Sequence, residues 1–223
     1  MPTGFAALDS ALDGGLPRAT IVELFGPSSS GKSTVALQIV AHAQKDGATA
    51  AWIDAEHAFD APYASSLGVQ VGQMPLAQPG SAEQALEIAC QLAGSAAVDL
   101  LIVDSAAALV PQLELESAMG DSGEGLHTRV LAWGLRKLAR TVANSGTVAV
   151  FLNQTRSRSN AAGGGEEISA GGPPLKLYAG LRLALDGQTG ERVGFRILKN
   201  KAATAFREGH LRRAPGGKFV ESP

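Results

Sequence analysis

The sequence predicts an α/β protein with a mainly parallel central sheet, flanking helices and an antiparallel C-terminal extension. Short, continuous apolar runs alternate with longer segments of helical period, which favours strand–helix–strand units. The early runs do not alternate with polar residues, as is typical of parallel strands buried on both faces. The last two runs are joined by the turn-forming stretch "DGQTG", which predicts an antiparallel hairpin.

The elements follow from these patterns in chain order. The predicted strands are Thr20–Phe25, Ala48–Ala55, Asp99–Ser105, Thr147–Gln154, Leu177–Leu185 and Val193–Lys199. The predicted helices are Lys32–Lys45, Ser81–Ala93 and Leu126–Asn144. We expect a single domain over residues 1–223. The glycine- and serine-rich segment 155–174 interrupts the pattern, and we expect it to be a mobile loop with a binding role.

Composition excludes several classes of protein. With 223 residues, 45% of them apolar and 18% charged, the chain can bury a sizeable core and is not disordered throughout. The net charge of −2 means that any basic, nucleic-acid-binding surface must be local. The single cysteine, Cys90, precludes an intrachain disulfide and fits a reducing compartment. Since we also find no apolar run of membrane-spanning length and no signal-peptide pattern, we expect a cytoplasmic protein.

The stretch "GPSSSGKST" follows a predicted strand and opens a predicted helix. It matches G-x-x-x-x-G-K-[ST], a loop whose backbone N–H groups form a cradle for phosphates together with the helix N-terminus. Lys32 adds positive charge for the β- and γ-phosphates, and Ser33 can supply an oxygen to Mg²⁺. The predicted nucleotide-binding residues of this phosphate-binding loop (P-loop) are Gly26, Pro27, Ser28, Ser29, Ser30, Gly31, Lys32, Ser33 and Thr34.

Carboxylates at two other strand ends complete the predicted site. "LLIVDS" places Asp104 at the edge where parallel sheets bind ligands, so Ser33 and Asp104 are the predicted Mg²⁺ residues, with Asp104 acting through water. Hydrolysis also needs a group that orients the attacking water. The stretch "IDAEHAFD" offers Asp54, Glu56, His57 and Asp60. Glu56 is the predicted catalytic carboxylate, because from this position it can point back toward the γ-phosphate.

A series of stretches along the chain carries a resemblance to one family. They are "GPSSSGKST", "WIDAEHAFD", "YASSLGV", "EQALEIA", "LLIVDSAAALVP", "MGDSGEGLHTR", "LRKLAR", "VFLNQTR", "GGPPLKLYAGLRL" and "LKNKAA". In order and spacing they resemble the ATPase core of the RecA/RadA recombinases, from Thr3 to about Arg207. The resemblance implies a RecA-like P-loop NTPase fold, ATP and Mg²⁺ as cofactors, and a role in DNA recombination and repair.

The resemblance also implies roles for single residues. Glu56 resembles the catalytic glutamate, and Gln154 resembles the glutamine that senses the γ-phosphate and signals to the second DNA-binding loop. Asp60 and Tyr63 resemble adenine contacts and join the predicted nucleotide-binding residues, as does Asp104. Lys199 and Lys201 resemble lysines that reach a neighbouring subunit's γ-phosphate across a filament interface, although two such lysines on a strand edge also fit a solvated face. The predicted catalytic residues are therefore Glu56, Lys32, Gln154, Lys199 and Lys201.

Single-stranded DNA is the partner that the resemblance implies. A first loop around "MGDSGEGLHTR" and a second at residues 155–174 would line a filament axis. The predicted DNA-binding residues are Arg129, Arg136, Arg156, Arg158, Gly171, Gly172 and Lys176. The basic side chains would meet phosphates and the glycines would let the backbone approach the strand, but each arginine alone fits a solvated surface equally well.

The chain also departs from the family pattern. We expect an ATPase core without the family's N-terminal docking segment and C-terminal domain. The second loop has no bulky apolar residue before Ile168. Leu177 stands where the family has an interface phenylalanine, and Pro215 lies near the position of a tyrosine that covers the adenine.

Two functional hypotheses remain open at the level of sequence. The first is a Mg²⁺-dependent, RecA-type ATPase that binds single-stranded DNA and acts in recombination and repair as an accessory paralogue. The second is a nucleotide-gated interaction module that modulates a recombinase filament or a repair polymerase, with little DNA-dependent turnover. The expected partners are single-stranded DNA, a RecA-type recombinase or other repair protein, and further copies of the chain, but no membrane.

Overall fold

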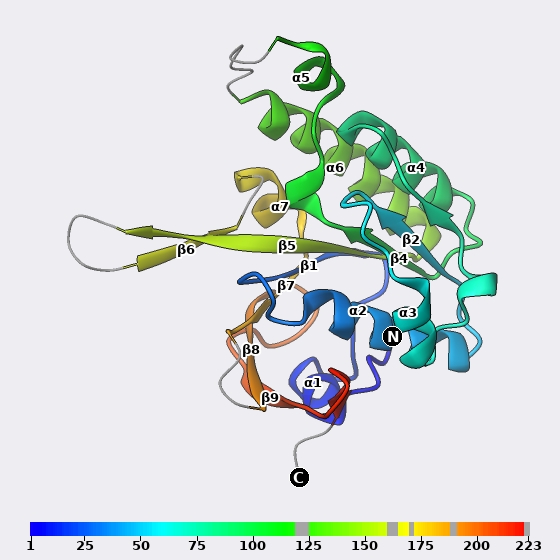
Figure 1. Cartoon of the computed structure of the whole chain (residues 1–223), viewed down its shortest axis with the longest axis vertical. Coiled ribbons are helices and arrows are strands. Elements are labelled where there is room, and N and C mark those ends of the chain that lie inside the picture. Colours follow the sequence, from blue (N-terminus) through cyan, green and yellow to red (C-terminus); the bar gives the residue numbers. More distant parts are fainter. Residues whose placement is uncertain (119–124, 160–164, 170–171, 188–190, 221–223) are drawn as a thin grey trace.

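A mainly parallel sheet runs through the centre of the molecule, and helices cover both of its faces (Figure 1). The computed structural model describes residues 1–118, 125–159, 165–169, 172–187 and 191–220. Its strands are β1 (Thr20–Gly26), β2 (Ala50–Asp54), β3 (Leu76–Ala77), β4 (Leu100–Asp104), β5 (Val148–Ser159), β6 (Gly165–Ser169), β7 (Leu181–Leu185), β8 (Arg192–Asn200), β9 (Glu208–Arg213) and β10 (Phe219–Val220). Its helices are α1 (Ala6–Ala11), α2 (Lys32–Lys45), α3 (Ala61–Ser66), α4 (Ala82–Gly94), α5 (Gln112–Glu116), α6 (Leu126–Ser145) and α7 (Pro173–Tyr178), with 3-10 turns η1 (Val71–Gln73) and η2 (Ala106–Ala108).

The strand order confirms the predicted fold class. The sheet reads β10-β9-β8-β7-β1-β5-β4-β2-β3, parallel from β7 to β3 and antiparallel from β7 to β10. Strand β1 lies at the centre, with Thr20 opposite Val148 and Gly26 opposite Gln154 on β5. Because neighbouring parallel strands end at the same edge, the loops that follow β1, β2, β4 and the paired part of β5 meet there.

Two apolar clusters, one on each face of the sheet, form the core. Helices α1 and α2 pack on one face, where Leu8 and Val35 are buried with Trp52. Helices α4, α6 and α7 cover the other face, where Leu86 and Phe151 are buried. Cys90 on α4 belongs to this second cluster: the residue is 7% exposed, and burial raises the pKa of its thiol.

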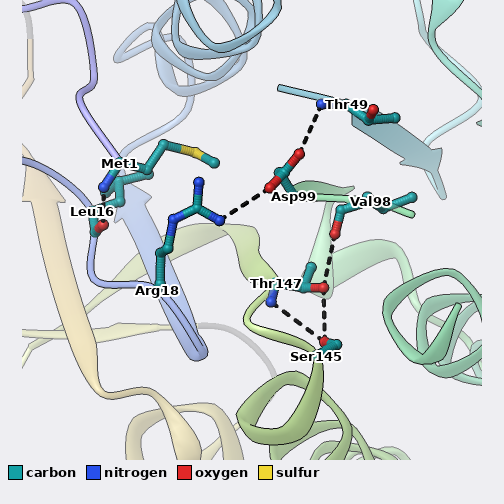
Figure 2. A network of polar contacts seen from close by, with 8 residues as sticks. All are labelled: Met1, Leu16, Arg18, Thr49, Val98, Asp99, Ser145 and Thr147. Carbon is teal, nitrogen blue, oxygen red and sulfur yellow. Dashed lines mark hydrogen bonds and ion pairs between the residues drawn. The ribbon is translucent and has the colours of Figure 1, made fainter. Parts of the chain in front are cut away.

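Polar contacts fasten the opposite, amino-terminal edge of the sheet (Figure 2). The Asp99 carboxylate, just before β4, accepts hydrogen bonds from the Thr49 N–H at 3.1 Å and from the Arg18 guanidinium at 3.0 Å. The Thr147 hydroxyl, just before β5, donates to the Val98 carbonyl at 2.8 Å. Strands β2, β4 and β5 are thus held together at this edge by the residues that immediately precede them in the sequence.

The prediction of a loop at residues 155–174 is wrong in one respect, because residues 155–159 and 165–169 form paired strands. Strand β5 continues past the sheet to Ser159 and pairs with β6, from Thr155 opposite Ser169 to Ser159 opposite Gly165. The two form a ribbon that extends away from the body of the molecule (Figure 1). Polar Ser and Arg residues give such a ribbon no apolar signal. Its expected mobility stays a prediction, and residues 160–164 and 170–171 lie outside the described part.

The prediction of a strand at Leu177–Leu185 is also wrong, for its first residues. Residues up to Tyr178 belong to α7, and the strand β7 begins at Leu181. Pro173 and Pro174 open α7, where proline's fixed φ and missing N–H suit the first helical turn. The other predicted strands and helices lie within a few residues of the observed ones, except that β5 is longer. In the part of the chain that the structure describes, no helix combines the length and apolarity needed to cross a membrane.

Candidate nucleotide site

The P-loop turns sharply between the end of β1 and the start of α2. Gly31 precedes α2 with a left-handed φ of 92°, and a Cβ there would lie 2.6 Å from the Phe219 ring. A Cβ on Gly26 would lie 2.3 Å from the Leu185 carbonyl oxygen of β7. Both glycines are therefore required by close approach, and they leave the N-terminus of α2 facing the loop that it follows.

Lys32 lies folded back over the P-loop. Its ammonium donates to the carbonyls of Pro27 at 2.7 Å and Gly26 at 3.1 Å. The residue is only 9% exposed, and burial lowers the pKa of its amine, against the opposing effect of Asp104 and Glu56. A partly desolvated ammonium held at the base of the loop is well placed to bind phosphate oxygens, which would replace the weaker carbonyl partners.

Ser33 and Asp104 meet where α2 begins and β4 ends. The Ser33 hydroxyl donates to Asp104 Oδ2 at 2.9 Å. Burial raises the pKa of Asp104 to about 6; the Ser33 hydrogen bond opposes this shift, and the carboxylates of Glu56 and Asp54 add to it.

This pair of oxygens fits Mg²⁺. The ion usually binds one or two protein oxygens and takes its remaining ligands from phosphates and water. The Ser33 hydroxyl and the Asp104 carboxylate, 2.9 Å apart, supply such protein oxygens beside the P-loop.

Glu56 is held in the same region by two side chains. Its Oε1 accepts a hydrogen bond from the Ser105 hydroxyl at 2.5 Å and a longer one from the Gln154 amide at 3.4 Å. The Glu56 N–H donates to the Asp104 carbonyl at 3.2 Å, which ties the loop after β2 to the end of β4. The predicted catalytic carboxylate and the predicted γ-phosphate sensor are therefore in direct contact.

Asp54, which lies in the same stretch as Glu56, has a structural role. It is 2% exposed, and its carboxylate accepts from the N–H groups of Ala58 and Phe59 at 3.1 and 3.0 Å and from the Gln78 amide at 2.8 Å. These bonds shape the loop that carries Glu56 and use the oxygens of Asp54 inside the fold.

A single cavity of about 330 Å³ joins these groups. Its walls come from the P-loop, the end of β4, the middle of β5 at Gln154, the loop after β2, and the end of β9. The lining residues are Ser28, Ser29, Gly31, Lys32, Ser33, Thr34, Glu56, Asp104, Ser105, Gln154 and Arg213. Basic, acidic and hydroxyl groups therefore face one space large enough for a phosphate chain.

The predicted adenine contacts lie beside this cavity and do not line it. Asp60 caps α3 by accepting a hydrogen bond from the Tyr63 N–H at 2.8 Å. The Tyr63 hydroxyl is 2.9 Å from the Thr34 hydroxyl, so α3 is connected directly to the first turn of α2.

Lys199 and Lys201 lie outside the cavity of their own chain. The Lys199 ammonium donates to the carbonyls of Lys176 and Leu177 near the end of α7, at 2.9 and 3.2 Å. Burial lowers the pKa of Lys199, and the neighbouring Lys201 and Arg182 act in the same direction. Their role toward a neighbouring subunit stays a prediction.

The predicted DNA-binding residues on helices lie on two helices that pack together. Arg129 and Arg136 are exposed on α6, and Lys176 is exposed on α7. The Arg136 guanidinium donates to the Tyr178 hydroxyl of α7 at 3.0 Å, which links the two helices. The structure therefore places three predicted phosphate contacts on one helix pair.

Of the remaining predicted DNA contacts, Arg156 and Arg158 belong to the ribbon and Gly172 directly precedes α7. Gly172 precedes α7 with a φ of 72°, and a Cβ there would lie 3.4 Å from the Thr128 hydroxyl on α6. Gly171 lies outside the described residues, as do the side chains of Arg156 and Arg158, whose backbone belongs to β5.

Sequence reasoning missed two residues of the cavity. Ser105 follows Asp104 directly, so a hydroxyl next to a strand-end carboxylate was an available signal. Arg213 comes from β9, far along the chain from the P-loop, and no local motif marks it.

Comparison with known proteins agrees with this geometry. The chain matches the RecA N-terminal domain family over residues 1–214. It is 47% identical over 227 residues to protein RecA of Frankia alni, 49% over 216 residues to that of Gluconobacter oxydans and 48% over 222 residues to that of Thermus thermophilus. These alignments cover 97%, 92% and 95% of this chain but 66%, 63% and 65% of the relatives, so the chain spans slightly less than two thirds of their length. With the P-loop, Asp104 and Glu56 around one cavity at the carboxyl edge of the sheet, the chain belongs to the RecA family.

Proposed function

We propose that this chain binds ATP with Mg²⁺ and hydrolyses it. The observation that carries the proposal is the position of Glu56, whose carboxylate faces the same cavity as the P-loop and is held there by Ser105 and Gln154. A nucleotide-binding fold needs only the P-loop and the metal residues. A carboxylate oriented beside them adds what hydrolysis requires.

Each residue then has a defined task. The backbone N–H groups of the P-loop and the ammonium of Lys32 bind the phosphates and neutralise charge that develops in the transition state. Ser33 and Asp104 would hold Mg²⁺, which supplies further charge neutralisation on the β- and γ-phosphates. Glu56 accepts a hydrogen bond from the attacking water and orients it in line with the γ-phosphate.

The proposal extends to single-stranded DNA through the path of β5. This strand pairs with β1 as far as Gln154 and with β6 from Thr155 onward, so Gln154 sits at the boundary between the sheet and the ribbon. A phosphate that displaces the Gln154 amide from Glu56 would act on the same strand that carries Arg156 and Arg158. We propose that this strand couples nucleotide state to DNA binding by the ribbon and the α6–α7 pair.

In this proposal the chain acts in DNA recombination and repair as an accessory, RecA-type ATPase, located in the cytoplasm. Further copies of the chain or a RecA-type recombinase are the proposed protein partners. The exposed Leu177, at 67%, and the Lys199 that caps the same short helix α7 offer a surface for such a contact.

Two variants test the nucleotide site. We expect Lys32→Ala to abolish nucleotide binding, because it removes the main cation of the P-loop. We expect Glu56→Gln to bind ATP normally but to lower turnover at least 100-fold, which is within the range for loss of a group that acts on the attacking water. Isothermal titration calorimetry and steady-state ATP hydrolysis measure the two effects.

Glu114→Gln, on the exposed helix α5, is the matched control and should behave like the unmodified chain. Normal turnover by Glu56→Gln would contradict the assignment of the catalytic carboxylate, and normal binding by Lys32→Ala would contradict the site itself.

A further inference from the structure

The turn between β9 and β10 is built against the P-loop helix. The Gln38 side chain on α2 makes two hydrogen bonds to the backbone of Phe219, donating to its carbonyl at 2.9 Å and accepting from its N–H at 2.7 Å. The Phe219 ring lies beside Gly31, where an added Cβ would come within 2.6 Å of it. The far end of the described chain is therefore fixed to the helix whose N-terminus faces the nucleotide cavity.

Arg213 reaches the cavity from this turn. It is the register partner of Phe219, and it lines the cavity together with the P-loop. A Cβ placed on Gly217 would lie 3.5 Å from Arg213 Nη2 and 3.3 Å from the Tyr63 hydroxyl, so the guanidinium and the phenol flank the same point. Tyr63 in turn contacts the Thr34 hydroxyl at 2.9 Å.

These contacts show which side of the cavity Arg213 occupies. Successive side chains on a helix point about 100° apart, since a turn has about 3.6 residues. The Ser33 hydroxyl contacts Asp104, whose backbone carbonyl is bonded to the Glu56 N–H, whereas the Thr34 hydroxyl contacts Tyr63, which flanks Gly217 together with Arg213. In a P-loop the backbone cradles the α- and β-phosphates while the lysine reaches the β- and γ-phosphates. Because Glu56 and Gln154 act at the γ-phosphate in the proposed function, the side on which Thr34 contacts Tyr63 corresponds to the α-phosphate.

We propose that Arg213 is a nucleotide-binding residue that contacts the α-phosphate with its guanidinium. Arginine presents a fork of N–H donors that matches two phosphate oxygens, and such charge-assisted bonds are among the stronger polar contacts in proteins. Because ADP and ATP share the α-phosphate, Arg213 holds substrate and product alike and does not distinguish them. The inference rests on the proposed nucleotide-binding function, and it assigns to the β9–β10 turn a direct part in that function.

The test is calorimetric titration of the protein, in a buffer that contains Mg²⁺, with ADP and with a non-hydrolysable ATP analogue. We expect Arg213→Gln to lower the affinity for both nucleotides by the same factor, about tenfold. The affinity of Arg213→Lys should lie between that of the unmodified chain and that of Arg213→Gln. The loss should shrink as ionic strength rises, because salt screens a charge-based contact. Arg212→Gln is the matched control, since Arg212 is the exposed neighbour on the same strand.

Three results would overturn the inference. They are unchanged affinity in Arg213→Gln, a loss confined to the ATP analogue, which would place the guanidinium on the γ-phosphate, and a loss that does not respond to salt. Thermal unfolding of each variant shows whether Arg213→Gln folds, and Arg213→Lys provides a second, milder test if it does not. Failure of the unmodified chain to bind either nucleotide would instead contradict the proposed function, so the two failures are distinguishable.

Discussion

At the scale of single residues, the nucleotide site contains a group that lowers the stability of the ligand-free chain. The group is Asp104, because burial beside other carboxylates raises its pKa to about 6 from 3.8. An ionised carboxylate in that position destabilises the ligand-free chain. Groups of this kind are common where ligand binding, and not stability, determines the residue.

We therefore expect Asp104→Asn to stabilise the ligand-free chain at pH 7 by on the order of 2–3 kcal/mol. Asparagine keeps an oxygen that can accept the Ser33 hydrogen bond but removes the charge. The extra stability of Asp104→Asn should increase as pH rises from about 4 to 6. Below about pH 4 it should vanish, because the Asp104 carboxyl is then protonated in both the folded and unfolded states.

Urea denaturation in a chelating buffer at pH 4 and pH 7 measures this effect. The same variant should bind Mg²⁺–nucleotide less tightly. A variant that is less stable than the unmodified chain at pH 7 would contradict the account of Asp104.

At the scale of elements, the helix pair α4–α6 depends on a close approach at one glycine. A Cβ on Gly134 of α6 would lie 2.4 Å from Cδ1 and 2.9 Å from Cβ of Leu86 on α4. We expect Gly134→Ala to lower the free energy of unfolding by about 1–3 kcal/mol, because overpacking forces the two helices apart.

Gly94→Ala is the control within the same helix pair. A Cβ there would lie 3.5 Å from Thr141 Cγ2, an ordinary contact, and alanine favours the helix by up to about 1 kcal/mol. We expect this variant to be as stable as the unmodified chain or more so. If the two alanine variants were equally stable in urea denaturation, the packing explanation would fail.

The amino-terminal edge of the sheet should affect stability without affecting the site. The Thr49 N–H and the Arg18 guanidinium hold the pKa of Asp99 below its usual value, so their stabilising effect is present at neutral pH and is lost as pH falls through the folded pKa. We expect Asp99→Ala to lower Tm by a few degrees at pH 7 and to leave the affinity for ADP unchanged. A loss of ADP affinity at unchanged Tm would show that the two edges are not independent.

The sequence predicted elements well where one periodicity dominated. Helix α2 begins and ends at the predicted residues, because the P-loop fixes its start and the buried apolar face continues to Ala43 in its last turn. The sequence-based prediction failed at residues 155–159 and 165–169, where the ribbon's polar Ser, Arg and Glu residues give no apolar pattern. It also failed at Leu177 and Tyr178, because the six-residue helix α7 is too short to show a helical period.

At the scale of the whole molecule, the sheet topology brings together parts of the site that lie far apart in the chain. Four parallel strands carry the site at the same edge of the sheet: the P-loop follows β1, Glu56 follows β2, Asp104 ends β4, and Gln154 ends the part of β5 that pairs with β1. The fold class alone therefore predicts that these residues meet. Arg213 was not predictable in this way. It depends on how the antiparallel extension folds back over α2, and that path is set by contacts such as Gln38 with Phe219, which leave no local pattern in the sequence.

The same continuity supports the proposed coupling of the nucleotide site to DNA. Strand β5 passes from the centre of the sheet, through Gln154 beside Glu56, into the ribbon that carries Arg156 and Arg158 (Figure 1). A rigid strand that connects two sites provides a physical route by which binding at one changes the other, provided that the Gln154 contact differs between nucleotide states.

The most direct test of this account is steady-state ATP hydrolysis by the purified chain, with and without single-stranded DNA, at low and moderate salt. We expect Mg²⁺-dependent turnover that rises several-fold with DNA, and a stimulation that weakens as salt increases, because phosphate contacts are salt-sensitive. Slow turnover that is indifferent to DNA at both salt concentrations would contradict the coupling and favour a nucleotide-gated module that acts on a protein partner.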